Sequence, residues 1–246
     1  MDSERVEGRR IGILLLLQMA SALILPFVLY GALAKGYPSY METVAESAAY
    51  VRAGLLVSFL GAGLTLALGI FMLPVLRRHS QMAAIFFLAL CVVSCTLDAV
   101  QNGAVLSMLS VGVKYANAGG ADTPLYQAWG AMASSIRLSA HIVQLFAIGA
   151  WMFTFYLGLF RYRLVPRPIA ALGIAGVLSQ FTGVTLMMFL GDSPITYLAI
   201  PLGPIHAIVA IWLIVKGTGP QPTPPVLDRT VERGIADRKQ QIRSAA

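Results

Sequence analysis

Residues 82–111 read MAAIFFLALCVVSCTLDAVQNGAVLSMLSV, an apolar run long enough to cross a lipid bilayer as one helix. A helix needs about 20 apolar residues to span the hydrocarbon core. Asp98 is the only charged residue in this run, and Gln101 and Asn102 follow it at helical spacing. The run therefore predicts a transmembrane helix with a small polar patch in its second half.

Similar apolar runs lie on both sides of this one, each ending at charged or turn-forming residues. The 246-residue chain is 57% hydrophobic and 12% charged, whereas soluble domains are about 45–50% apolar and about 25% charged. This composition excludes a soluble enzyme, a disordered chain and a disulfide scaffold. It predicts an all-α, polytopic bundle of six spans, with five or seven as alternatives. The spans cover about residues 11–34, 51–76, 82–111, 131–160, 168–190 and 196–215.

The net charge of +7 would suggest nucleic acid as a partner in a soluble protein. Here the basic residues gather in the segments expected on one side of the membrane, which marks the cytoplasmic side. Both termini are therefore predicted in the cytoplasm, and nucleic acid is not predicted as a partner. Three basic residues fall in opposite loops: Lys35, Arg52 and Lys114. The cytoplasmic set is Arg5, Arg9, Arg10, Arg77, Arg78, Arg161, Arg163, Arg167, Lys216, Arg229, Arg233, Arg238, Lys239 and Arg243.

The first predicted span has an alternative interpretation as a secretory signal. Arg9-Arg10 precede the apolar run, and Ala32-Leu33-Ala34 resemble a cleavage site before Lys35. A signal has an apolar region of about 7–15 residues. This run has about 24 and contains Pro26, so we expect a retained span.

Two regions are predicted along the chain. Residues 1–217 form the transmembrane domain, and residues 218–246 form a Pro-rich linker followed by a basic cytoplasmic tail. The linker is predicted to be stiff and partly extended. The tail has the apolar spacing of a short amphipathic helix, with disorder as the alternative.

Polar residues within the spans are the candidate functional residues, because ionisable groups at membrane depth are costly and usually face the bundle interior. On the predicted span 131–160, Arg137, His141 and Gln144 share one helical face. Helical rise places them at a depth similar to that of Asp98, in the outer part of the bundle.

These groups suggest an outward-facing polar pocket in which Asp98 pairs with Arg137 or His141. Such a pocket could bind a small polar or amphipathic ligand, or relay protons. Two alternatives remain: the pair is a structural clasp between helices, or Arg137 extends to the interface without a partner. The candidate ligand-binding residues are Asp98, Gln101, Asn102, Arg137, His141, Gln144 and His206.

His206 follows Pro201, Gly203 and Pro204, so the last span is expected to bend or break just before it. Its depth differs from that of His141 by roughly 15 Å, which argues against a shared haem or metal. No metal-binding or cofactor motif is present in the sequence, so no cofactor is predicted. Cys91 and Cys95 are expected to be buried free thiols.

The segments FRYRLVPRPIAALG, at residues 160–173, and IWLIVKG, at residues 211–217, resemble a bacterial family of six-span membrane proteins. This family is catalogued as the domain of unknown function DUF4386. The likeness is strongest over residues 160–217, roughly a quarter of the chain. The resemblance implies a six-helix bundle in a bacterial inner membrane, and it carries over no catalytic residue.

The favoured function is a non-enzymatic ligand-binding, transport-like or accessory component of the bacterial inner membrane. One alternative is a membrane-embedded enzyme that uses Asp98 and His141 as an acid–base pair. The other is a structural subunit of a membrane complex. The expected partners are membrane lipid, a small ligand and other membrane subunits.

Overall fold

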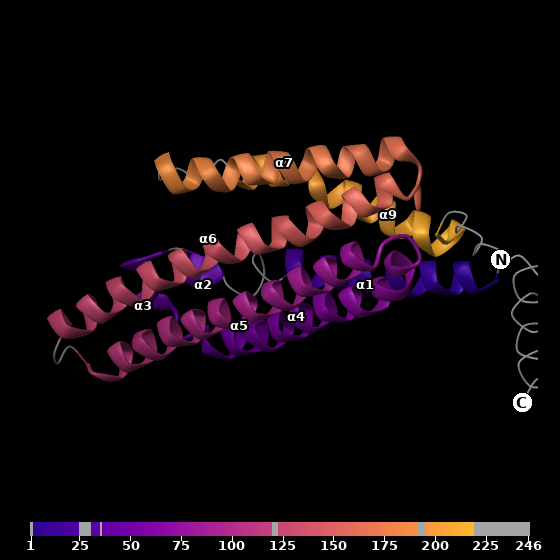
Figure 1. Ribbon diagram of the computed structural model, residues 1–246. Helices are drawn as coiled ribbons and strands as arrows, with labels where there is room; N and C mark the ends of the chain where they lie inside the picture. The colour runs from indigo at the N-terminus through magenta and orange to yellow at the C-terminus, as the bar shows by residue number, and fades with distance from the viewer. Residues whose placement is uncertain (1, 25–30, 35, 120–122, 191–194, 219–246) are drawn as a thin grey trace, which may run out of the picture.

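The computed structural model describes residues 2–24, 31–34, 36–119, 123–190 and 195–218 (Figure 1). All regular elements within these ranges are α-helices, which confirms the predicted all-α class. In chain order they are α1 (Asp2–Ile24), α2 (Gly31–Ala34), α3 (Ser39–Thr43), α4 (Ala48–Arg77), α5 (Gln81–Asn117), α6 (Thr123–Arg161), α7 (Arg167–Leu190), α8 (Ile195–Ala199) and α9 (Leu202–Lys216).

Local signals in the sequence account for several helix ends. Ser80 has extended backbone, and its hydroxyl accepts a hydrogen bond from the Ala83 N–H at 3.3 Å, so it caps the start of α5. Gly217 follows α9 with φ 78°, a conformation that glycine adopts without steric cost. Its N–H donates to the Leu213 carbonyl at 3.0 Å, which satisfies one of the last carbonyls of the helix.

Five described segments are long and apolar enough to cross a membrane: α4, α5, α6, α7 and the segment Tyr197–Lys216. They correspond to the second to sixth predicted spans. The first predicted span, 11–34, corresponds to the second half of α1 and to α2, and parts of it lie outside the described residues. The count of six spans therefore stays a prediction.

Two helices, α5 and α6, are longer than the apolar runs from which they were predicted. α6 begins at Thr123 rather than near residue 131, and Pro124 is tolerated there because the first turn of a helix needs no intrahelical N–H donor. With 39 residues in α6, the axial rise is about 58 Å. The hydrocarbon core is about 30 Å thick, so one end of α6 extends well beyond it.

The predicted break before His206 is confirmed. α8 ends at Ala199 and α9 begins at Leu202, with Pro201 between them. The Ser179 hydroxyl on α7 donates to the Leu198 carbonyl of α8 at 2.9 Å. This bond satisfies a carbonyl near the break and ties α8 to α7.

Small residues on α4 allow close packing on two of its sides. α4 packs against both α5 and α1. A Cβ at Gly61 would lie 2.6 Å from the Ser21 hydroxyl of α1, and one at Gly69 would lie 2.9 Å from the Cβ of Cys91 on α5. Both Cys91 and Cys95 are free thiols, as predicted; Cys91 is buried, whereas Cys95 is only half-buried, which corrects the prediction that both are buried.

Basic segments predicted on one side of the membrane do gather at one end of the bundle, here called the basic end. Arg78, after α4, forms a salt bridge with Glu7 of α1 at 2.6 Å. The rings of His79 and Tyr162 stack at 4.5 Å, which joins the α4–α5 turn to the α6–α7 turn. Gly217 lies directly beside Gly8 of α1.

Two hydrophobic cores hold the helices together. The basic-end core includes Phe87 and Cys91 of α5, Trp151 and Phe155 of α6, and residues of α1, α4, α7 and α9. The far core lies toward the opposite end of α4, α5 and α6, where the segment around α3 covers them. Its members are Leu33, Tyr40, Met41, Val44, Val51, Leu55, Val105, Met108, Leu109 and Ala133.

Tyr40 fixes the α3 segment to α6. Its side chain is fully buried, and its hydroxyl donates to the Gly130 carbonyl at 3.1 Å. Gly130 has no side chain, which lets the side chains of Tyr40 and Met41 approach α6 closely. Burial raises the pKa of Tyr40 to about 12, with a smaller contribution from the nearby Tyr37.

Candidate functional site

A layer of polar side chains separates the two cores. On α5, Cys91 is the last buried member of the basic-end core and Val105 is the first member of the far core. On α6, the corresponding interval runs from Ala133 to Trp151. Seven of the polar residues between these limits make up what we call the polar layer: Ser94, Asp98, Gln101 and Asn102 of α5, and Arg137, His141 and Gln144 of α6.

A hydrogen-bonded chain links the two helices within this layer. The Gln144 Nε2 donates to Oδ1 of Asp98, and the Gln144 Oε1 accepts from Nδ1 of His141 at 3.2 Å. The direct pairing of Asp98 with Arg137 or His141 that the sequence suggested is therefore replaced by a chain through Gln144. With Nδ1 donating, a neutral His141 keeps its acceptor lone pair on Nε2.

Several other atoms of the polar layer are buried without a hydrogen-bond partner among the described residues. Three of them belong to side chains of α5 that are almost fully buried, with exposed fractions of 0% for Ser94, 7% for Gln101 and 2% for Asn102, and the fourth belongs to the half-buried Arg137 of α6. A buried polar group without a partner costs about 1–3 kcal/mol, so each such atom requires a water or a ligand. The unpartnered atoms are Oγ of Ser94, Oε1 of Gln101, Nδ2 of Asn102 and Nε of Arg137.

Arg137 is half-buried, and its guanidinium makes no ion pair within the described part of the chain. It lies one turn beyond His141 on the same face of α6. The antiparallel pairing of α5 and α6, fixed by the Asp98–Gln144 bond, places Arg137 at the level of Val105 on α5, three residues beyond Asn102. The positive charge therefore lies at the far edge of the polar layer.

His206 lies outside the polar layer, in the basic-end core. Its side chain is 2% exposed, and its Nδ1 is 2.7 Å from the Tyr156 hydroxyl. The rings of Trp151, Phe155 and Tyr156 surround it, with centroids 5.8–6.4 Å away. Gln144 precedes Tyr156 by twelve residues, about 18 Å of helical rise, so His206 does not join the candidate site.

Sequence reasoning did not single out Ser94, Tyr156 or Trp151. Ser94 precedes Asp98 by one helical turn, and this spacing is a signal that was available in the sequence. Nothing in the sequence indicates that Tyr156 bonds His206, because these residues meet only through the packing of α6 and α9. The indole Nε1 of Trp151 and Nε2 of His206 are also buried without a partner among the described residues.

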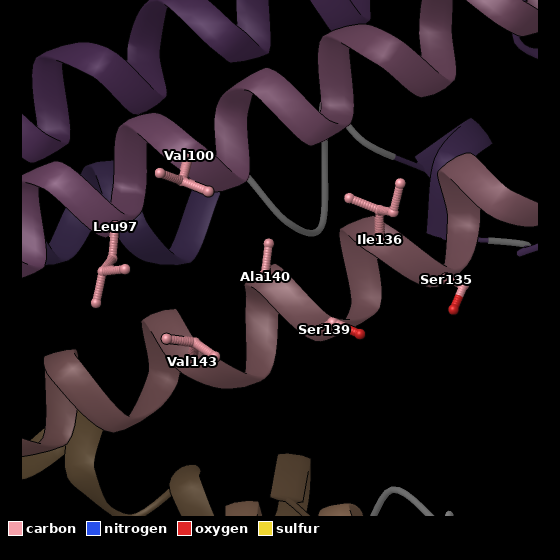
Figure 2. Close-up of a pocket in the computed structure, with 7 residues that line it drawn as sticks. All are labelled: Leu97, Val100, Ser135, Ile136, Ser139, Ala140 and Val143. Atoms are coloured by element: carbon pink, nitrogen blue, oxygen red, sulfur yellow. The ribbon is translucent and has the colours of Figure 1, made fainter.

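An apolar groove of about 370 Å³ runs along the α5–α6 seam (Figure 2). By helical spacing, its lining residues on α6 lie on a different face of the helix from His141. Its lining has a few hydroxyls and no charge. The lining residues are Leu97, Val100, Ser135, Ile136, Ser139, Ala140 and Val143. Within a membrane, such a groove suits a lipid acyl chain rather than a polar ligand.

The described helices offer no cluster of metal ligands. In the described ranges, no group of three His, Cys, Asp or Glu residues lies close enough to hold a metal ion. The polar layer offers one carboxylate, one imidazole, one guanidinium, three amides and one hydroxyl, a set suited to hydrogen bonding with a polar molecule.

Comparison with known proteins identifies one family. A family model described as "Domain of unknown function (DUF4386)" matches residues 11–217, which is most of the chain. No curated protein and no solved structure matches the chain.

Proposed function

The chain belongs to the DUF4386 family, a domain of unknown function, and we propose that it is a non-enzymatic bacterial inner-membrane protein that binds a small polar ligand in its polar layer. Its role is ligand binding, transport or an accessory function, with the site open to the outer face. The proposed topology has six spans, with both termini in the cytoplasm.

The basic end supports this topology. Arg77 and Arg78, Arg161 and Lys216 terminate α4, α6 and α9, and basic residues next to spans mark the cytoplasmic side. The start of α1 lies at the same end, through the Arg78–Glu7 salt bridge. The N-terminus therefore shares the cytoplasmic side, and α1 continues into the proposed first span.

Depth supports an outward-facing site. From Gln81, the first residue of α5, to Asp98, helical rise is about 26 Å, and from Arg161 back to Arg137 it is about 36 Å. The hydrocarbon core is about 30 Å thick, so Asp98 lies just inside its outer boundary and Arg137 lies beyond it. The polar layer then lies at the outer boundary of the membrane, where water and solutes reach it.

The main support for the proposal is the set of buried polar atoms in the polar layer that have no hydrogen-bond partner among the described residues. Three almost fully buried side chains of α5 and one arginine of α6 have atoms that nothing in the described ranges satisfies. A structural clasp needs only the Asp98–Gln144 bond. The surplus of unsatisfied donors and acceptors next to this bond is the property expected of a binding site.

The enzyme alternative requires a carboxylate within hydrogen-bond reach of a histidine. Gln144 lies between Asp98 and His141 and bonds to both, so the geometry favours ligand binding over acid–base catalysis. The alternative of a structural subunit relies on residues 218–246, of which only Thr218 lies within the described ranges. Membrane lipid remains an expected partner, with the α5–α6 groove as a surface for its acyl chain.

Native mass spectrometry of gently solubilised protein tests the proposal. We expect the wild-type chain to carry a bound small molecule that is lost in Asp98→Asn and retained in Arg52→Gln, a charge change on an exposed residue of α4. A wild-type chain without any bound molecule contradicts ligand retention. Bound partner chains in its place favour the subunit alternative.

A further inference from the structure

We propose that the ligand carries an anionic oxygen group, a carboxylate or a phosphate, which Arg137 binds. This inference rests on the proposed function and adds the chemical class of the ligand. It comes from the balance of charges and donors within the polar layer.

Among the described residues, no carboxylate forms an ion pair with Arg137. Its Nε is buried and has no hydrogen-bond partner among the described residues. Asp98, the one carboxylate of the polar layer, accepts its bond from Gln144, and the one salt bridge in the described ranges joins Arg78 to Glu7. A guanidinium partly removed from water is best satisfied by a carboxylate or a phosphate, which it binds through two parallel hydrogen bonds.

The unsatisfied atoms show the same preference. At the far edge of the polar layer, Nδ2 of Asn102 and Nε of Arg137 are both donors, and both lack acceptors within the described ranges. In the register set by the Asp98–Gln144 bond, Arg137 lies about 4.5 Å further from the basic end than Asn102. A carboxylate or a phosphate has several acceptor lone pairs and can accept from both donors.

One neighbouring atom indicates a second feature of the ligand. Oε1 of Gln101 is a buried acceptor without a donor, and Gln101 lies at the level of His141, about one turn closer to the basic end than Arg137. A ligand that places its anion against Arg137 can direct a hydroxyl or an ammonium group toward Gln101. The polar layer thus prefers an anionic end facing outward and a donor on the inner side.

The anionic group has two sources, a water-soluble solute or an anionic lipid headgroup, because Arg137 lies near the outer membrane boundary. The test therefore uses nanodiscs of two compositions. In pure phosphatidylcholine, hexanoate is the probe, with hexan-1-ol and hexylamine as neutral and cationic controls of the same chain length. A second set of nanodiscs contains phosphatidylglycerol.

The measurement is the thermal unfolding midpoint of wild type, Arg137→Gln and Arg52→Gln as each of the three probes is added in increasing concentration. Arg52→Gln is the matched control, because it removes the same charge from an exposed site at the far end of α4. We expect hexanoate to raise the midpoint of wild type and Arg52→Gln and to bind Arg137→Gln at least about tenfold more weakly, since a hydrogen bond to a charged group contributes about 1.5–3 kcal/mol. Hexan-1-ol and hexylamine should give no comparable rise.

The lipid arm identifies the source of the anion. If phosphatidylglycerol raises the midpoint of wild type but not of Arg137→Gln and weakens the hexanoate response, the anion is a lipid headgroup. A hexanoate response unchanged by phosphatidylglycerol assigns a solute. An equal response to all three probes, or an undiminished hexanoate response in Arg137→Gln, overturns the inference that Arg137 binds an anionic group. Either result leaves the proposed ligand-binding function standing. No response to any probe or to phosphatidylglycerol, with no bound molecule in native mass spectrometry, overturns the proposed function as well.

Discussion

The side-chain amide of Gln144 on α6 donates a hydrogen bond to the carboxylate of Asp98 on α5. The same amide accepts a hydrogen bond from His141, so a single side chain aligns the polar groups of two helices. This chain lies between two hydrophobic cores. Four further polar atoms of the polar layer, one each on Ser94, Gln101, Asn102 and Arg137, are buried without a partner among the described residues.

Asp98→Asn separates a binding site from a structural clasp. The asparagine oxygen can still accept from Gln144, so we expect a loss of stability below about 1 kcal/mol. Ligand retention should be lost, because the charge is gone. Thermal unfolding and native mass spectrometry of one preparation measure both effects. Poor folded yield of Asp98→Asn would instead identify a clasp.

Gln144→Leu removes the shared partner of Asp98 and His141. We expect the free energy of unfolding to fall by about 1–3 kcal/mol, because a buried carboxylate and an imidazole N–H lose their bonds together. Gln127→Leu, at an exposed position of the same helix, is the control and should change stability by less than about 0.5 kcal/mol. Equal effects of the two substitutions on thermal unfolding would contradict the linking role of Gln144.

Much of the fold could be predicted from the sequence, because a bilayer imposes a simple length and polarity rule. The positions of α4 and α7 and the break before His206 follow from apolar length, charged ends and proline. The early start of α6 at Thr123 was missed, because residues 123–130 extend the helix with mixed polarity. Hydropathy detects membrane depth, whereas helices continue beyond it.

The candidate site could be predicted only in part. Helical spacing placed Asp98 and Gln144 at similar depth, but it could not assign their bond, because the partner of a side chain depends on helix rotation and packing. His206 was grouped with the site by its residue type, although packing places it against Tyr156 and Trp151. Depth counting along the helices had already indicated this separation.

Gly173→Ala tests the packing around His206. A Cβ at Gly173 would overlap the ring of Tyr156, the residue that bonds His206. We expect a loss of about 1–3 kcal/mol, typical of overpacking in a tight core. Gly63→Ala on α4 meets no atom within 4 Å and should stabilise the helix by up to about 1 kcal/mol. Similar unfolding midpoints for the two variants would contradict the close contact of α6 and α7.

Tyr40 predicts an alkaline transition in the segment around α3. Its pKa is raised from 10.0 to about 12 because the phenol is buried. The folded state then holds this proton more tightly than the unfolded state, so the stabilisation is complete below pH 10 and is lost as pH rises through about 12. The ultraviolet titration of tyrosinate in wild type minus that in Tyr40→Phe should show one step near 12. A step near 10 in the folded protein would contradict the burial of Tyr40.

The proposed function requires that the polar layer be open to the outer face. Labelling of Arg137→Cys, at the half-buried outer edge of the polar layer, by a membrane-impermeant maleimide tests this requirement in right-side-out vesicles, in a chain with Cys91→Ala and Cys95→Ala. Tyr50→Cys, at an exposed position of α4, and Lys216→Cys, at the basic end, are the outer and inner references. We predict that Arg137→Cys and Tyr50→Cys are labelled from outside and that Lys216→Cys is not. Labelling of Arg137→Cys only in inside-out vesicles, or only after denaturation, would contradict an outward-facing site.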